Sequence, residues 1–266
     1  RYLEYVVLGK STEGRDMHHV ILAKNRKAID TYLNYTLPLM KENPKKLQEM
    51  IENGTIGDYK VPIFFNNIHP DEAPGVDVIL KLLEKLATED VLTYKDFESI
   101  KEPMTPNKDG RNIEDSSTER IININVDEAL DNIIFLFNFT ENPDGRYYNT
   151  RQNVNGFDVN RDNGYQTQVE SKLVTAQIAK WSPISMIDYH GFVKGFLIEP
   201  CTTPHEPNYE YDLLIENMLE QAHLMGRAGV ANTKYTSYVI PYEDYSGGWD
   251  DGTPAYTPTY AMFHGA

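Results

Sequence analysis

The chain has 266 residues, of which 40% are hydrophobic, so it is long enough to bury one sizeable core. Its formal net charge is −15, and a surface that acidic repels phosphate backbones and anionic lipids, which argues against nucleic-acid and membrane partners. No run approaches the roughly 18 consecutive apolar residues of a membrane span. The single cysteine, Cys201, excludes an intrachain disulfide.

Strand-like and helix-like segments alternate along the chain and favour an α/β fold. In chain order, we predict strands at 5–8 and 19–23, helices at 29–40 and 45–53 with breaks at Pro38 and Pro44, a strand at 61–68, helices at 75–87 and 126–131, a strand at 133–139, a helix at 169–180, a strand at 184–188 and a helix at 211–230. Residues 101–120 are expected to form a surface loop. The pattern predicts a single domain over 1–266 with a mixed, mostly parallel, twisted sheet flanked by helices.

Three of the predicted apolar strands end in polar clusters. The first cluster contains His69 and Glu72, the second lies within residues 138–161, and the third contains Asp188 and His190. Ligands of open α/β sheets bind outside the carboxyl ends of the strands, so we expect the three clusters to meet at one site.

His69, Glu72 and His190 are the candidate metal ligands. An imidazole and a carboxylate three residues apart, on a turn that leaves a buried strand, can hold one ion together. Two His and one Glu leave a zinc position open for water, which is typical of a hydrolytic site. Taken singly, the first two also fit a solvated turn and His190 a hydrogen-bonded strand end. Asp188 is a candidate acceptor for the second ring nitrogen of His190.

The second cluster, within residues 138–161, carries two arginines ten residues apart. Asn142-Pro143-Asp144-Gly145 reads as a turn, and Arg151 and Arg161 follow in a polar, glycine-bearing stretch. A guanidinium can fork onto a substrate carboxylate, but these arginines can equally pair with local Asp residues. Residues 241–260 mix tyrosines with glycines, which fits either a mobile loop lining a pocket or an ordinary surface loop.

Together these residues resemble the zinc carboxypeptidase family, the carboxypeptidase A-like metallopeptidases. The resemblance covers nearly the whole chain. Five motifs carry it in the family's order: His69-Pro70-Asp71-Glu72, Asn142-Pro143-Asp144-Gly145, Arg151, Gly156-Phe157-Asp158-Val159-Asn160-Arg161, and His190. Asp71 departs from the pattern, since many relatives carry Arg there, and subsite contacts are expected to differ.

The resemblance implies a zinc metallocarboxypeptidase that cleaves the C-terminal bond of peptides with a free terminal carboxylate. One Zn²⁺ per chain would be held by His69, Glu72 and His190. Arg151 would polarise the scissile carbonyl, and Asn160 and Arg161 would clamp the terminal carboxylate.

Substrate selection is expected to involve the 242–251 loop. The resemblance places a mobile tyrosine before Ser246-Gly247-Gly248, where Tyr242 and Tyr245 are both candidates. Asp250 would attract a basic terminal residue, or is a surface acid of an acidic protein.

The family's general base, a Glu on a later strand, has no counterpart before Ala266. We therefore expect it beyond residue 266, in a chain that stops before its last strand and helix. The alternative functions are a non-catalytic zinc- or peptide-binding module, and a deacylase or amidase of N-acyl amino acids or cell-wall peptides. Because the sequence starts at Arg1 rather than Met, and from family habit, we expect a secreted or extracellular protein.

Overall fold

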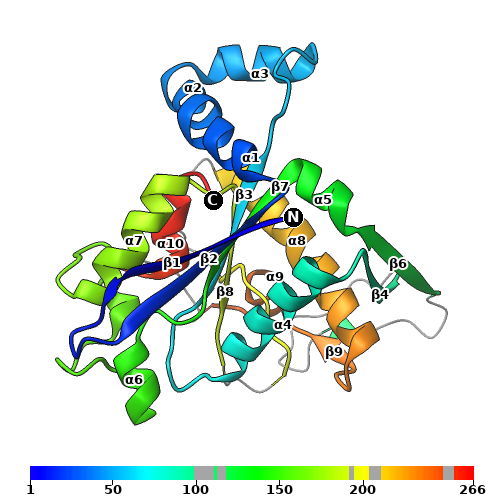
Figure 1. Cartoon of the computed structure of the whole chain (residues 1–266). Coiled ribbons are helices and arrows are strands. Elements are labelled where there is room, and N and C mark those ends of the chain that lie inside the picture. Colours follow the sequence, from blue (N-terminus) through cyan, green and yellow to red (C-terminus); the bar gives the residue numbers. More distant parts are fainter. Residues whose placement is uncertain (99–110, 113–117, 192–194, 204–210, 248–254) are drawn as a thin grey trace. The chain divides into compact units, whose positions relative to one another are not determined.

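The computed structural model describes residues 1–98, 111–112, 118–191, 195–203, 211–247 and 255–266 (Figure 1). The chain divides into two compact units: residues 1–90, 125–191 and 254–266 form the first, and residues 91–124 and 192–253 the second. Among the described helices, none has the length and apolar character needed to cross a bilayer. The expectation of one catalytic domain over 1–266 stays a prediction.

The first unit is built on a five-stranded sheet with the order β1-β2-β7-β3-β8. β2 runs antiparallel to both of its neighbours, β1 and β7, whereas β7, β3 and β8 run parallel to one another. The strands are β1 (Tyr2–Lys10), β2 (Asp16–Ala23), β3 (Val61–Asn67), β7 (Ile133–Asn138) and β8 (Ser185–Tyr189). The predicted mixed sheet with a parallel core is thereby confirmed.

The central strands β3 and β7 are apolar because both of their faces are covered, as expected for parallel strands. Phe64 and Leu136 are fully buried in a core cluster that also contains Trp181 of α7 (Val169–Trp181). Phe65 and Phe137, whose neighbours in sequence point to the opposite face, have ring centroids 5.3 Å apart. The strand ends are therefore held firmly in place.

Helices cover both sides of this sheet, with α7 and α10 (Thr257–Met262) on one side and α4 (Pro74–Thr88) and α5 (Val126–Asn132) on the other (Figure 1). The remaining helical segments of the unit are α1 (Arg26–Thr31), the π-helix Tyr32–Thr36, α2 (Leu37–Glu42), α3 (Pro44–Glu52), α6 (Pro143–Tyr148) and the 3₁₀ turn Val159–Arg161.

Two sequence-based expectations need adjustment in this unit. Pro38 does not break the helical stretch, because it lies in the first turn of α2, directly after the π-helix. Asn142-Pro143-Asp144-Gly145 is not an isolated turn but the start of α6. There the Asn142 side chain accepts a hydrogen bond from the Gly145 N–H, as a helix N-cap does.

The first turn of α4 packs directly against β3 and β8 through Gly75. A Cβ atom at this position would lie 2.4 Å from Nδ2 of Asn67 and 2.8 Å from Cβ of Tyr189. The same Asn67 Nδ2 donates to the backbone carbonyls of Glu72, at 3.3 Å, and Tyr189, at 3.0 Å. The start of α4, the preceding turn and the end of β8 are thus tied together.

The described part of the second unit contains two small sheets and one long helix. β4 (Val91–Phe97) pairs with β6 (Glu119–Asn125), and β5 (Arg111–Asn112) pairs antiparallel with β9 (Ser237–Tyr238). The helices are α8 (Tyr211–Asn232) and α9 (Pro241–Asp244). Asn232 of α8 makes two hydrogen bonds with the backbone of Lys95 in β4.

The expected loop over residues 101–120 falls largely outside the described residues. Its described parts are strands rather than loop, since β5 lies within it and β6 begins at Glu119. β4 was not predicted, because its apolar and polar residues alternate over only a few positions.

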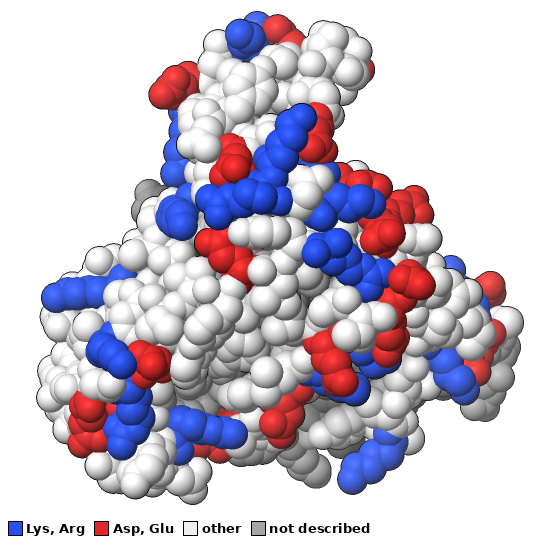
Figure 2. All heavy atoms as spheres, viewed as in Figure 1, with Lys and Arg blue, Asp and Glu red and all other residues white. Residues whose placement is uncertain are grey.

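Acidic and basic side chains are interspersed on the face of the molecule shown in Figure 2. In the first unit, for example, Arg26 pairs with Asp30 at 3.0 Å and Arg1 with Asp90 at 2.9 Å. The net charge of −15 therefore does not separate into single-sign regions on that face.

Candidate metal centre

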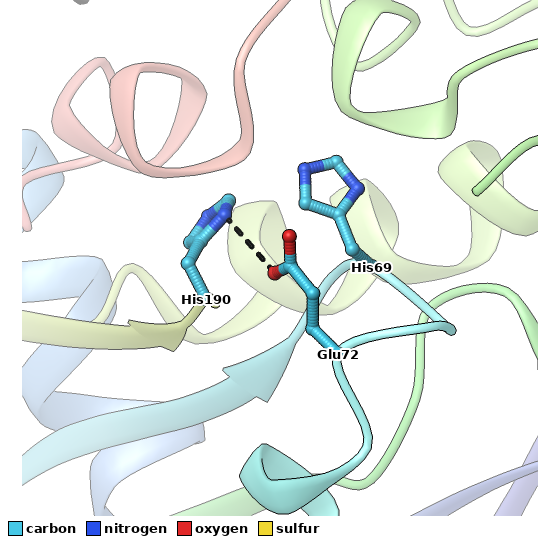
Figure 3. Close-up of side chains that lie close together, drawn as sticks. All are labelled: His69, Glu72 and His190. Carbon is cyan, nitrogen blue, oxygen red and sulfur yellow. Dashed lines mark ion pairs between the residues drawn. The ribbon is translucent and has the colours of Figure 1, made fainter. Parts of the chain in front are cut away.

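The three predicted ligands converge at the carboxyl ends of β3 and β8, within the first unit. His69 lies two residues beyond β3, and His190 follows β8 directly. The strands are parallel neighbours with Asn67 opposite Tyr189, so the two exits are adjacent. One potential ligand atom from each of His69, Glu72 and His190 lies within 4.8 Å of the others (Figure 3).

The turn from His69 to Glu72 brings two of the ligands to the same side. The Glu72 N–H donates to the His69 carbonyl at 3.1 Å, which closes a four-residue turn ahead of α4. The Nδ2 of Asn67 donates a hydrogen bond to the Glu72 carbonyl. The spacing of the motif is thus explained by the tight turn between a buried strand and a helix.

Glu72 is the centre of the cluster and is only 6% exposed. Its Oε2 accepts a hydrogen bond from the Gly191 N–H at 2.8 Å and lies 3.6 Å from Nδ1 of His190 (Figure 3). Burial raises the pKa of Glu72, while the Gly191 N–H, His190 and Arg151 act in the opposite direction. A bound cation would favour the ionised carboxylate further.

His69 is the buried imidazole of the pair, with 1% of its surface exposed. Burial, followed by the nearby His190, Arg151 and Arg161, lowers its pKa from 6.5 to about 2. The ring is therefore neutral, which is the form that binds a metal ion. Its Nδ1 is buried without a hydrogen-bond partner among the described residues, and Oδ1 of Asp158 lies 3.9 Å from it.

His190 is the more open imidazole, with 31% of its side chain exposed. Its Nε2 lies 3.2 Å from Oδ2 of Asp188, so the predicted pairing of these two side chains is confirmed. A carboxylate that receives one ring N–H leaves the other nitrogen to face Glu72. This orientation, together with the neutral His69 and the Glu72 carboxylate, fits a metal ion bound by two imidazoles and one carboxylate.

Arg151 lies beside the cluster. It both pairs with a local Asp and approaches one of the candidate metal ligands. Its Nε donates to Oδ2 of Asp158 at 2.8 Å, which is the local ion pair. Its Nη1 lies 3.7 Å from Oε1 of Glu72, so the guanidinium also reaches the ligand group. The side chain is 37% exposed and accessible to a substrate.

Asn160 and Arg161 are neighbours in sequence with contrasting positions. Asn160 is fully buried, its Oδ1 accepts from the N–H of Thr257 at 2.9 Å, and its Nδ2 lies 3.5 Å from Nε2 of His69. Arg161 is exposed, and its Cζ lies 5.6 Å from the ring centroid of Tyr256. The Tyr256 ring is in turn 5.9 Å from that of His190. Arg161 is thus the solvent-facing cation of this group.

None of the predicted specificity residues belongs to the described part of the first unit. Tyr242 and Tyr245 belong to the second unit, where Tyr242 packs against Tyr238 and Ile240. Asp250 lies outside the described residues. Their assigned roles stay predictions.

Three residues near the centre were not singled out from the sequence. Tyr256 lies within the aromatic segment without a distinguishing signal. Glu141 and Thr257 are fully buried and connect to Asn160. Glu141 could have been noticed, since it is an acid three residues beyond the end of the apolar strand β7.

Several solved structures with a similar arrangement of strands and helices are carboxypeptidases. Carboxypeptidase A from Helicoverpa armigera aligns with a TM-score of 0.59 and 14% identity over 99% of this chain and 57% of its own. A metallo-carboxypeptidase from Burkholderia cenocepacia aligns with a TM-score of 0.58 and 13% identity over 98% and 52%. One from Pseudomonas aeruginosa, in complex with (2-guanidinoethylmercapto)succinic acid, gives 0.54 and 12% over 97% and 52%.

The chain has the metallo-carboxypeptidase fold. It spans little more than half the length of those three proteins. No protein-family model and no curated protein matches the sequence. The expected resemblance is confirmed for the fold, and in this metallo-carboxypeptidase fold the His69-Glu72-His190 group is compatible with a metal site.

Proposed function

We propose that this protein is a zinc-dependent metallocarboxypeptidase that hydrolyses the C-terminal peptide bond of peptides or proteins. The observation that carries the proposal is the convergence of His69, Glu72 and His190, with one ligand atom of each within 4.8 Å of the others. Two imidazoles and a carboxylate are the donor set of hydrolytic zinc sites. The carboxypeptidase-like fold of the chain supports the same assignment.

The protein prepares this site through burial and orientation. His69 is kept neutral, Glu72 is fixed by the Gly191 N–H, and His190 is oriented by Asp188. A bound zinc ion would supply Lewis-acid polarisation and activation of a water molecule.

Arg151 and Arg161 would act on different parts of the substrate. Arg151 is held by Asp158 next to Glu72, where a fixed guanidinium stabilises negative charge developing on a carbonyl oxygen. Arg161 is exposed beside Tyr256, and its planar fork suits a terminal carboxylate. The side-chain Oδ1 of Asn160 already accepts from the Thr257 N–H, so we assign Asn160 to supporting the site and keep its contact with substrate as a prediction.

The substrate class follows from the same two cations, and we propose a peptide with a free C-terminal carboxylate. The P. aeruginosa protein holds a ligand with succinate carboxylates and a guanidine group. That compound is a suitable competitor here, because its carboxylates can meet Arg161 and Arg151. Secretion of the protein stays a prediction.

The test is release of the C-terminal residue, by the full-length protein, from a peptide with a free terminus and from its amidated counterpart. We expect release from the free peptide only, loss of activity with a chelator, and recovery when zinc is added back. Equal cleavage of both peptides would contradict the carboxylate clamp. Cleavage of N-acyl amino acids or cell-wall peptides alone would indicate the deacylase or amidase, and stoichiometric zinc without any turnover would indicate a binding module.

A further inference from the structure

A continuous line of buried polar side chains joins the surroundings of the two histidines. All of them belong to the first unit. Of the five between the two histidines, Asn66, Glu141, Thr257 and Asn160 are fully buried, and the side chain of Asp188 is 1% exposed. From one imidazole to the other, the line runs through His190, Asp188, Asn66, Glu141, Thr257, Asn160 and His69.

Asn66, on the central strand β3, is the first junction. Its Nδ2 donates to Oδ1 of Asp188 at 3.0 Å and to Oε2 of Glu141 at 3.2 Å, which uses both amide hydrogens. Its Oδ1 accepts from Nδ2 of Asn138 at 2.5 Å. Because the amide is engaged on both sides, it holds the Asp188 carboxylate that orients His190.

Thr257, at the start of α10, is the second junction. Its N–H donates to Oδ1 of Asn160 at 2.9 Å, and its Oγ1 accepts from Nδ2 of Asn163 at 2.8 Å. The hydroxyl hydrogen is shared between Oε2 of Glu141, at 3.3 Å, and Oδ1 of Asn160, at 3.1 Å. Thr257 therefore links Glu141 to the amide that touches His69.

Glu141 stands where these two branches meet. Its carboxyl group is fully buried, and no described Lys, Arg or His forms an ion pair with it. Burial, and then the charge of Asp188, raises the pKa of Glu141 well above 4.5. An uncharged acid that accepts two hydrogen bonds through Oε2 is consistent with such a position, whereas an isolated buried carboxylate would be very costly.

We propose that Glu141 is a positioning residue of the candidate metal site, which fixes the two histidines relative to each other without touching either. Through Asn66 it holds the partner of His190, and through Thr257 it holds the partner of His69. The inference rests on the metal site of the proposed function, although it does not require peptidase activity. Direct hydrogen-bond partners of metal ligands typically change metal affinity 10–100-fold when they are removed, and Glu141 supports two such partners at once, Asp188 and Asn160.

The experiment compares zinc affinity in wild type, Glu141→Gln and Glu141→Leu, measured by competition with a chelating indicator. Gln can accept the same two hydrogen bonds through its carbonyl oxygen, so we expect a Kd within about 3-fold of wild type. Leu has a similar volume but no acceptor, and we expect zinc binding to weaken by about 10–100-fold. The visible absorption spectrum of the Co²⁺ form should change with Leu and not with Gln.

Glu170→Leu is the matched control for general damage to the fold. Glu170 is also fully buried, and its carboxylate accepts from the Thr12 N–H at 2.8 Å and from Nδ2 of Asn153 at 3.2 Å. It lies outside the line between the two histidines. We expect this variant to lower the melting temperature while leaving the zinc Kd and the Co²⁺ spectrum unchanged.

The inference is overturned if Glu141→Leu folds and binds zinc as tightly as wild type, or if Glu170→Leu weakens zinc equally. If Glu141→Leu does not fold, Thr257→Val and Thr257→Ser decide: Val, which lacks the hydroxyl, should weaken zinc by several-fold and Ser should not. Equal Kd values for those two would also overturn it. Zinc binding by wild type without peptide hydrolysis refutes the proposed activity alone, whereas absence of zinc binding by wild type refutes both.

Discussion

The two histidines of the candidate metal centre have contrasting surroundings. His69 is 1% exposed and follows a strand with neighbours on both sides, whereas His190 follows the strand at the edge of the described sheet and has 31% of its side chain exposed. The edge position is compensated by Asp188, which contacts the His190 ring directly, while His69 relies on burial and a more distant Asp158. A metal site can therefore be held by packing on one side and by a hydrogen bond on the other.

The largest expected effect is loss of the metal ion when either histidine is replaced. We expect His69→Ala and His190→Ala each to abolish stoichiometric zinc binding, because each removes one of three ligands. Metal analysis after dialysis against a chelator-treated buffer measures this. Zinc content near one per chain in both variants would show that the ligand assignment is wrong.

The two arginines should differ in which kinetic constant they affect. Arg151→Ala is expected to lower kcat by about 10²-fold or more, because it removes stabilisation of charge that develops during reaction. Arg161→Ala is expected mainly to raise KM for peptides with a free terminus. Steady-state kinetics on free and amidated peptides separates the two, and identical profiles for both variants would contradict the division of roles.

Replacing the carboxylate near each imidazole, Asp188 for His190 and Asp158 for His69, tests directly how much each histidine depends on its neighbour. We expect Asp188→Asn to weaken zinc binding by about 10–100-fold, because the contact with Nε2 of His190 is 3.2 Å. Asp158→Asn should weaken it less, since Asp158 lies 3.9 Å from the His69 ring, which is also fixed by burial. The Kd of each variant is the readout. A larger loss of zinc affinity for Asp158→Asn would show that His69, rather than His190, depends more on its neighbouring carboxylate.

His19, on β2, provides a measure of what burying an imidazole costs without a metal partner. It is fully buried, neither ring nitrogen has a hydrogen-bond partner among the described residues, and burial lowers its pKa from 6.5 to about 3. The folded state therefore excludes a proton that the unfolded chain accepts below pH 6.5. The stabilising contribution is complete above that pH and is lost as the pH falls towards 3.

From pH 6.5 to 5.5 this linkage amounts to about 1 kcal/mol of unfolding free energy. Urea denaturation of wild type and His19→Leu at both pH values should show wild type losing that much more stability on acidification. Parallel losses in the two proteins would mean that His19 is protonated in the folded state.

The parts of the site that follow from chain-local rules were predictable from the sequence. Apolar runs of the right length identified β3, β7 and β8, and the rule that ligands gather at the carboxyl ends of strands brought His69, Glu72 and His190 together. The contacts of Glu141 and Thr257 could not be predicted in this way, even though the position of Glu141 after a strand was a signal, because their partners Asn66 and Asn160 lie 75 and 97 positions away. Helix α6 was missed because a turn and a helix N-terminus share the same residue preferences.

Gly75 is a position where a substitution is expected to disturb the candidate metal site, although Gly75 is not one of the candidate ligands. The space between helix α4, Asn67 and Tyr189 has no room for a methyl group, since an added Cβ would meet both residues at less than 3 Å. Alanine there would force α4 away from the ends of β3 and β8, which precede His69 and His190. The absence of a side chain at residue 75 thus sets the distance between α4 and the two strands. The relative positions of His69, Glu72 and His190 depend on that distance.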